Sequence, residues 1–149
     1  MSITPKLSER GYVSKVSRVV IDTNVIISAL LFGGKPGKLI PLFQNRRIEP
    51  IVSRDIIDEY IRVLAYPKFQ LNEKEIQFLL YRKLLRYFEI VETSQGEIII
   101  SNDPSDDKFI QCALAGNAKT IVSGDSHLLS LKTYQDIHIL SPAQYLDLS

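Results

Sequence analysis

Short apolar runs alternate with amphipathic stretches along the 149-residue chain. Residues 19–21 are all β-branched, which is typical of a strand that is buried on both faces of a sheet. Similar short runs at 50–52, 120–123 and 137–140 are predicted to be further strands. Because helical patterns separate these runs, we expect an α/β fold in which helices cover a mainly parallel sheet.

Capping and helix-breaking residues divide the intervening stretches into helices. Gly33 and Gly34 are predicted to end the first helix, and Ser53 is placed to cap a helix that stops before Pro67. Asn72, with a glutamate three positions later, resembles a capping box. The predicted helices span 25–32, 36–45, 54–66, 73–88, 103–116 and 125–131, a helical turn or two follows residue 142, and residues 97–100 are predicted to be extended.

Length and composition indicate one globular domain. The chain is 45% hydrophobic and 23% charged, with a net charge of +1, which predicts neither disorder nor a strongly basic surface. Its single cysteine, Cys112, forms no disulfide within the chain, as is usual in the cytoplasm. No apolar run reaches the roughly 18 residues of a membrane span. We expect residues 1–17 to be a flexible N-terminal extension and residues 18–149 to form a cytoplasmic domain.

Acidic residues occur where predicted strands end, or on a helix near such a junction. Asp22 follows the first buried strand and Asp125 follows the strand at 120–123. Ligands of parallel sheets bind beyond the carboxyl ends of strands, so both side chains are expected at one crevice. Further candidates are Glu59 and the group Asp103, Asp106 and Asp107. Carboxylates gathered together repel one another unless a divalent cation lies between them, and an all-oxygen site favours Mg²⁺ or Mn²⁺ over zinc.

Most of these acids also have a structural interpretation. Asp22 is suited to cap the end of its strand, and Asp125 is suited to a turn after residues 122–124. Asp103, followed by proline, resembles the start of a helix. Negative charge in the first turn of that helix, at Asp106 and Asp107, complements the helix dipole. The joint pattern of acids therefore indicates a site more strongly than any single member.

Two further acids and the two histidines also have alternative interpretations. Glu59 and Asp58 flank opposite edges of one apolar helical stripe, so periodicity does not choose between them. His127 follows the last acidic motif and is interpreted as a bystander, and His138 in the final strand is interpreted as structural.

Four ordered motifs resemble those of the PIN domain (PilT N-terminus), a family of metal-dependent ribonucleases that is common among the toxins of toxin–antitoxin pairs. The resemblance runs from Arg18 to about Leu146. The matching segments are Val20-Ile21-Asp22-Thr23-Asn24-Val25, Glu59-Tyr60 with Val63-Leu64, Asp103-Pro104-Ser105-Asp106-Asp107-Lys108-Phe109 with Ala113, and Ile121-Val122-Ser123-Gly124-Asp125 with Leu128-Leu129. The third and fourth segments are most similar to the branch that contains toxin components.

The resemblance implies a three-layer α/β/α sandwich with a central, mainly parallel sheet. It implies a ribonuclease that hydrolyses RNA phosphodiesters with a water activated by Mg²⁺ or Mn²⁺, leaving a 3′-hydroxyl and a 5′-phosphate. It also implies a homodimer with a cognate antitoxin protein as partner. The catalytic, metal-binding acids that it implies are Asp22, Glu59, Asp106 and Asp125, with Asp107 as an alternate or helper, and the residues that orient them are Thr23, Asn24 and Ser123.

Binding of an RNA backbone requires local cations, because the net charge is close to zero. The cations predicted to lie in loops around the site are Lys35, Lys38, Arg46, Arg47, Arg54, Lys68 and Arg82.

Two other classes of protein compete with this interpretation. Receiver-like and haloacid-dehalogenase-like phosphoryl-transfer folds require further acids beside the first one, whereas Thr23 and Asn24 follow Asp22 here. A catalytically silent PIN-like module that binds RNA or protein is the second alternative, and the presence of all four acids counts against it.

Overall fold

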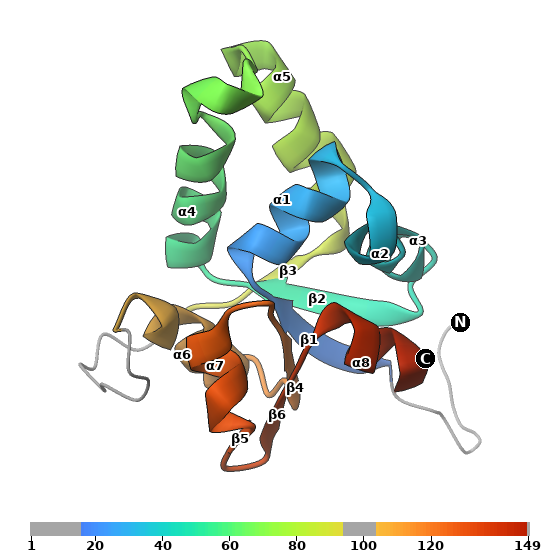
Figure 1. The fold of residues 1–149 in the computed structure, drawn as a ribbon, viewed down its shortest axis with the longest axis vertical. Coiled ribbons are helices and arrows are strands. Elements are labelled where there is room, and N and C mark those ends of the chain that lie inside the picture. The colour runs from blue at the N-terminus through green and yellow to red at the C-terminus, as the bar shows by residue number, and fades with distance from the viewer. Residues whose placement is uncertain (1–15, 94–103, 149) are drawn as a thin grey trace.

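The computed structural model describes residues 16–93 and 104–148, and Figure 1 labels its elements. The strands are β1 (Ser17–Ile21), β2 (Ile48–Val52), β3 (Glu89–Ile90), β4 (Thr120–Val122), β5 (Thr133–Tyr134) and β6 (Ile137–Leu140). The α-helices are α1 (Thr23–Leu31), α2 (Gly34–Gly37), α3 (Leu39–Gln44), α4 (Arg54–Leu64), α5 (Glu73–Gln77), α6 (Asp107–Ala115), α7 (Ser126–Leu131) and α8 (Pro142–Leu148). The other helical segments are the 3₁₀ turns η1 (Pro67–Phe69), η3 (Leu85–Tyr87) and η4 (Pro104–Asp106) and the π-helical η2 (Phe78–Leu84).

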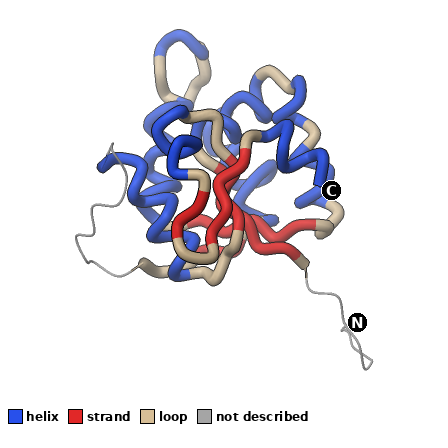
Figure 2. The backbone as a smooth tube through the Cα atoms, turned by 60° about the horizontal axis from the view of Figure 1, so that its bottom comes forward, coloured by secondary structure: helices blue, strands red, loops and turns tan. Residues whose placement is uncertain are grey.

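The six strands form one sheet in the order β3-β2-β1-β4-β6-β5, and only β5 runs antiparallel to its neighbour. Successive side chains of a strand point to opposite faces of a sheet. Val19, Val20 and Ile21 are all 0% exposed, so both faces are covered at β1. Figure 2 shows the strands in the centre with helices on either side. The predicted α/β fold with a central, mainly parallel sheet is therefore confirmed.

The order of the strands places a crevice beside β1. From β1 the chain adds β2 and then β3 on one side, and later adds β4 and β6 on the other side. Connections that leave two adjacent parallel strands in opposite directions open a crevice at the carboxyl ends of those strands. Here the two strands are β1 and β4, which end directly before Asp22 and Ser123.

The first helices differ in extent from the prediction for 25–32 and 36–45. Helix α1 starts at Thr23 because Asp22 caps it, and it ends before Gly33 and Gly34, whose φ angles of 75° and 62° suit glycine. The segment predicted as a single second helix is two short helices, α2 and α3, which meet at Lys38. In Figure 1, α1 lies between α2 and α3 on one side and α4 and α5 on the other.

The segment predicted as one helix over 73–88 is divided into three pieces. Its start is as predicted, because the side chains of Asn72 and Glu75 each accept a hydrogen bond from the other residue's backbone N–H. The chain then widens into η2, from which Leu80 and Leu84 pack into the core, and narrows into η3. The predicted helix is therefore irregular after its first turns, although both leucines are buried as a helical stripe predicts.

Some sequence predictions fall outside the described residues. These are the extended piece at 97–100, the cap at Asp103, and most of the proposed extension at 1–17. Within the described residues β1 starts at Ser17, and the two-residue strands β3 and β5 were not predicted. No single helix in residues 16–93 and 104–148 is long and apolar enough to cross a membrane, and one pair bent by 87°, α1 with α2–α3, meets the criterion by length and composition only.

Candidate metal centre

Asp22 is held rigidly at the carboxyl end of β1. Its Oδ1 accepts a hydrogen bond of 2.9 Å from the backbone N–H of Val25, which caps α1, and its Oδ2 accepts one from the hydroxyl of Ser123. The backbone N–H of Asp22 donates to the carbonyl of Val122 on β4 (2.9 Å). The residue is 4% exposed. The structural interpretation of Asp22 as a cap is therefore correct, and the same contacts aim its carboxylate at the crevice.

The environment of Asp22 disfavours its negative charge. Burial raises the pKa of this carboxyl, and the charge of Asp125 raises it further. Hydrogen bonds from Ser123 and from the backbone N–H groups of Val25 and Gly124 lower the pKa without cancelling the effect of burial. A cation placed beside this carboxylate would provide the missing compensation.

Ser123 joins the ends of β1 and β4. It is 0% exposed, and its hydroxyl donates to Asp22 while accepting a hydrogen bond of 2.9 Å from the backbone N–H of Asp125. One side chain thereby fixes both the orientation of one acid and the backbone of another. This is the arrangement expected of a residue that orients metal-binding groups.

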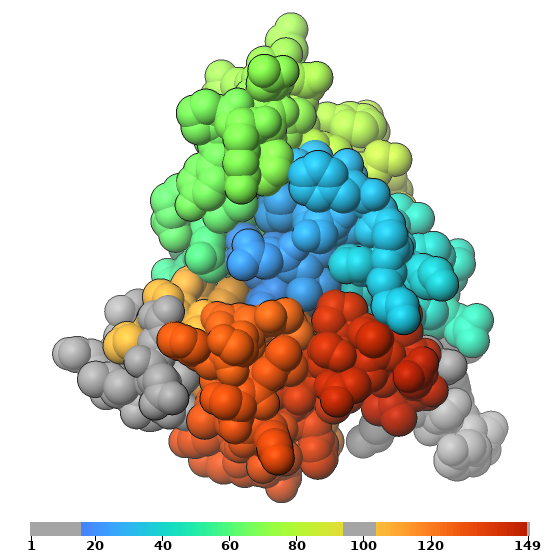
Figure 3. Space-filling view, in the orientation of Figure 1, coloured from blue at the N-terminus to red at the C-terminus, as the bar shows by residue number. Residues whose placement is uncertain are grey.

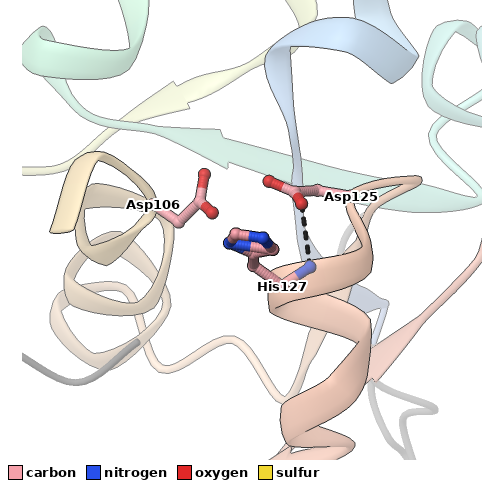
Figure 4. Close-up of side chains that lie close together, drawn as sticks. All are labelled: Asp106, Asp125 and His127. Atoms are coloured by element: carbon pink, nitrogen blue, oxygen red, sulfur yellow. Dashed lines mark hydrogen bonds between the residues drawn. The ribbon is translucent and has the colours of Figure 1, made fainter. Parts of the chain in front are cut away.

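Asp106, Asp125 and His127 form a group of potential metal ligands. One ligand atom from each lies within 4.8 Å of the others. Figure 4 shows the side chains of Asp125 and His127, at the start of α7, facing Asp106 at the start of α6. The Oδ1 of Asp125 also accepts a hydrogen bond of 2.9 Å from the backbone N–H of His127. This geometry places an imidazole beside two of the predicted acids, and the interpretation of His127 as a bystander stays a prediction.

Glu59 lies on α4 and contacts Thr23, the residue that follows Asp22. Its Oε1 accepts a hydrogen bond of 2.8 Å from the hydroxyl of Thr23 and lies 3.3 Å from the Nζ of Lys108 on α6. Arg62 is a more distant and exposed partner, at 4.0 Å from Oε2. Asp58 is exposed. Of the two acids, Glu59 is therefore the one that contacts Thr23 and Lys108, and its role in the site stays a prediction.

The predicted site residues are therefore placed in three connected positions. Asp106 and Asp125 lie together, Asp22 is joined to Asp125 through Ser123, and Glu59 is joined to the end of β1 through Thr23. The remaining two predicted residues are Asp107, which is 5% exposed at the start of α6, and Asn24, which is exposed.

Lys108 is a residue of this site that the sequence analysis missed. Only 17% of its side chain is exposed, and its Nζ donates to the carbonyl of Ser105 besides pairing with Glu59. A cation in the first turn of a helix opposes the helix dipole. The sequence signal for Lys108 was therefore a lysine at an unfavourable helical position, directly after two aspartates and before a phenylalanine.

The predicted cations do not all lie near the site. Arg46 and Arg47 directly precede β2, so they lie at the amino end of the strands, opposite the crevice. That part of the prediction is wrong, because both arginines lead into β2, which runs parallel to β1 and therefore has its carboxyl end, not its amino end, at the crevice. Lys68 lines a groove that also contains Glu59.

The chain belongs to the PIN domain family, because the model of the PIN domain matches residues 18–127. It is 34% identical over 122 residues to the uncharacterized protein MJ1680 of Methanocaldococcus jannaschii, in a match that covers 77% of this chain and 75% of the relative.

Solved structures with a similar fold include VapBC2 from Rickettsia felis, bound to a DNA fragment from their promoter, with a TM-score of 0.57 at 18% identity over 83% of this chain and 98% of the matched chain. FitAcB from Neisseria gonorrhoeae has a TM-score of 0.56 at 16% identity, covering 84% and 98%. PAE2754 from Pyrobaculum aerophilum has a TM-score of 0.58 at 15% identity, covering 89% of each chain. At these identities the likeness shows the fold alone.

Proposed function

We propose that this protein is a metal-dependent ribonuclease and the toxin of a toxin–antitoxin pair. The observation that carries the proposal is the convergence of Asp106, Asp125 and His127 at the crevice where Asp22 is buried. Membership of the PIN family, whose domains are generally nucleases, supports the same activity. The proposed catalytic acids are Asp22, Glu59, Asp106 and Asp125.

A divalent cation fits this site by the chemistry of its donors. Asp106, Asp125 and His127 would hold it, with Asp22 connected to Asp125 through Ser123 and Asp107 as a helper. Carboxylates suit Mg²⁺ and Mn²⁺, and the imidazole favours Mn²⁺ of the two. When bound, the cation would lower the pKa of an attacking water and stabilise charge on the phosphodiester.

The chain's own residues supply rigidity and charge. Ser123 and Thr23 donate hydrogen bonds that orient Asp22 and Glu59, so neither carboxylate needs to reorganise when substrate arrives. Lys108 pairs with the same carboxylate oxygen of Glu59 and adds a positive charge near the anionic substrate. Asn24 reaches the groove beside Glu59 and is proposed to assist there. Hydrolysis is proposed to leave a 3′-hydroxyl and a 5′-phosphate.

The proposed partners are an RNA substrate, a cognate antitoxin protein and a second copy of the chain, all in the cytoplasm. The motif resemblance to toxin components supports the antitoxin, and the fold likeness to VapBC2 and FitAcB agrees with it. A neighbouring antitoxin gene whose product co-purifies with this chain would strengthen the assignment.

The decisive experiment is cleavage of a mixed-sequence single-stranded RNA with Mn²⁺, with Mg²⁺ and with a chelator. Wild type is compared with Asp22→Asn and Glu59→Gln, and with Asp58→Asn as a matched control on the same helix. Cleavage that needs the metal, is lost in the first two variants and persists in the control is expected. If the folded, antitoxin-free chain cuts no RNA under any condition, the protein is a binding module instead.

A further inference from the structure

A groove of about 740 Å³ lies between α1, α4 and η1. Glu59 and Asn24, both from the acidic motifs, line one part of it. The surfaces of α1 (blue) and α4 (green) meet on the face of the molecule seen in Figure 3. The groove therefore shares one proposed catalytic acid, Glu59, with the site at which the proposed chemistry takes place.

Aromatic side chains line the part of the groove contributed by the ends of α1 and α4. Phe32 is 71% exposed and Tyr66 is 43% exposed, although most large apolar side chains of the described residues are buried or partly buried. The ring of Phe69 lies 6.1 Å from the ring of Phe32 at an angle of 53°. Exposed aromatic rings grouped around a hollow indicate a ligand that covers them.

A cation accompanies these rings. The Nζ of Lys68 lies 5.2 Å from the centre of the Phe69 ring, and Lys68 also lines the groove. The groove thus combines flat aromatic faces, one ammonium group, and polar side chains such as Asn24 and Ser28. Aromatic faces interleaved with cations are the means by which proteins bind single-stranded nucleic acid, since every base has a face that stacks.

We propose that this groove binds an unpaired nucleobase next to the scissile phosphate, stacked on Phe32 and Tyr66, with Lys68 contacting a neighbouring phosphate. The proposal rests on the proposed ribonuclease function and assigns the residues that hold one base beside the scissile bond. Stacking of this kind requires bases that are not paired, because a duplex hides their faces. The groove therefore selects the substrate, and the acids cut it.

The test measures the binding of a fluorescein-labelled single-stranded RNA of about ten nucleotides by fluorescence anisotropy. A chelator is present, so that no cleavage occurs. Phe32→Leu and Tyr66→Leu remove a ring while keeping an apolar side chain. Tyr81→Leu is the matched control, because Tyr81 is 55% exposed and does not line this groove. Circular dichroism verifies that all variants are folded.

Phe32→Leu is expected to weaken the binding of single-stranded RNA about tenfold, and Tyr81→Leu to change it less than about twofold. A duplex of the same sequence should bind more weakly and equally to all the variants. Equal affinities of Phe32→Leu and Tyr81→Leu for the single strand would overturn the proposal. Unchanged RNA binding combined with loss of a co-purifying antitoxin would also overturn it, in favour of a protein ligand.

These outcomes are separable from those of the proposed function. If wild type binds the single strand through Phe32 but never cuts it, the nucleobase site stands and the nuclease assignment fails. If wild type cuts RNA and Phe32→Leu binds and cuts equally well, the nuclease assignment stands and the nucleobase site fails.

Discussion

Two clusters of charged residues on the same sheet differ in whether their charges are compensated. On β1, the guanidinium of Arg18 lies 2.7 Å from Glu49 on β2 and 2.9 Å from Glu89 on β3, and its Nε donates to the carbonyl of Gly116. All three nitrogens of this guanidinium have an acceptor. At the end of the same strand, the buried carboxylate of Asp22 has hydrogen bonds but no cation beside it among the contacts of the described residues.

The pKa values of the two clusters show the difference. A hydrogen bond from Arg18, together with its charge, lowers the pKa of Glu89 despite some burial. Burial raises the pKa of Asp22. Structural ion pairs thus carry their own compensation, whereas the candidate metal centre carries an excess of negative charge. Such an imbalance is retained at a functional site because a ligand removes it.

Asp22→Asn should have the largest effect on the difference between the two clusters, because it removes the uncompensated charge at nearly constant volume. Cleavage is expected to fall to background, while the free energy of unfolding measured in chelator at neutral pH rises. The substituted asparagine can keep the capping hydrogen bond from the backbone N–H of Val25, since its side-chain carbonyl oxygen is also an acceptor. Urea denaturation followed by circular dichroism provides the measurement.

The gain from Asp22→Asn should depend on pH in a defined direction. Because the folded pKa of Asp22 lies above the ordinary value of 3.8, the folded chain binds a proton that the unfolded chain releases between the two values. Wild-type stability therefore falls as the pH rises through this window. The advantage of the variant should be absent below the ordinary value and complete above the folded one. An advantage that is independent of pH would contradict this account.

Lys108→Met should make the candidate site more negative, since it removes the cation inside the site and keeps the apolar part of the side chain. Glu59 loses the partner at 3.3 Å, and cleavage is expected to fall about tenfold or more. Mn²⁺ measured by electron paramagnetic resonance should bind more tightly, because a competing positive charge is gone. Arg62→Gln is the control, since Arg62 is 62% exposed and 4.0 Å away. A parallel loss of Mn²⁺ affinity would assign Lys108 a purely structural role.

Arg18→Met tests the balanced cluster. It leaves Glu49 and Glu89 without their cation, but these side chains are partly exposed, so the expected loss of stability is about 1 kcal/mol. Cleavage per folded molecule should not change, because the cluster lies away from the carboxyl ends of the strands. Urea denaturation and the RNA assay, run on the same preparation, compare the two effects.

His127→Gln is expected to have the smallest effect. An imidazole nitrogen suits Mn²⁺ better than Mg²⁺, so its loss should lower the affinity for Mn²⁺ about threefold and leave that for Mg²⁺ nearly unchanged. Titration calorimetry with each ion in turn measures the ratio. Equal changes for both ions would place His127 outside the coordination sphere.

Local sequence patterns predicted the elements that position the site, because their signals depend on neighbouring residues. The β-branched run before Asp22, the cap at Ser53 and the capping box at Asn72 all form as predicted. The strands β3 and β5 were missed, since each has only two residues and pairs through its backbone at the edge of the sheet. The π-helical turn was missed because Leu80 and Leu84 keep the spacing of an α-helix in the local pattern.

The sequence by itself determined that acids follow buried strands and that the chain has the motifs of a PIN domain. Only the tertiary structure decided which groups meet: that Ser123 reaches Asp22 across 101 positions, that Glu59 rather than Asp58 faces Thr23, and that Lys108 and His127 join the site. The physical reason is that the local pattern of residues determines whether a segment forms a helix or a strand. The partners of each side chain depend instead on the order of the strands, which places β4 beside β1.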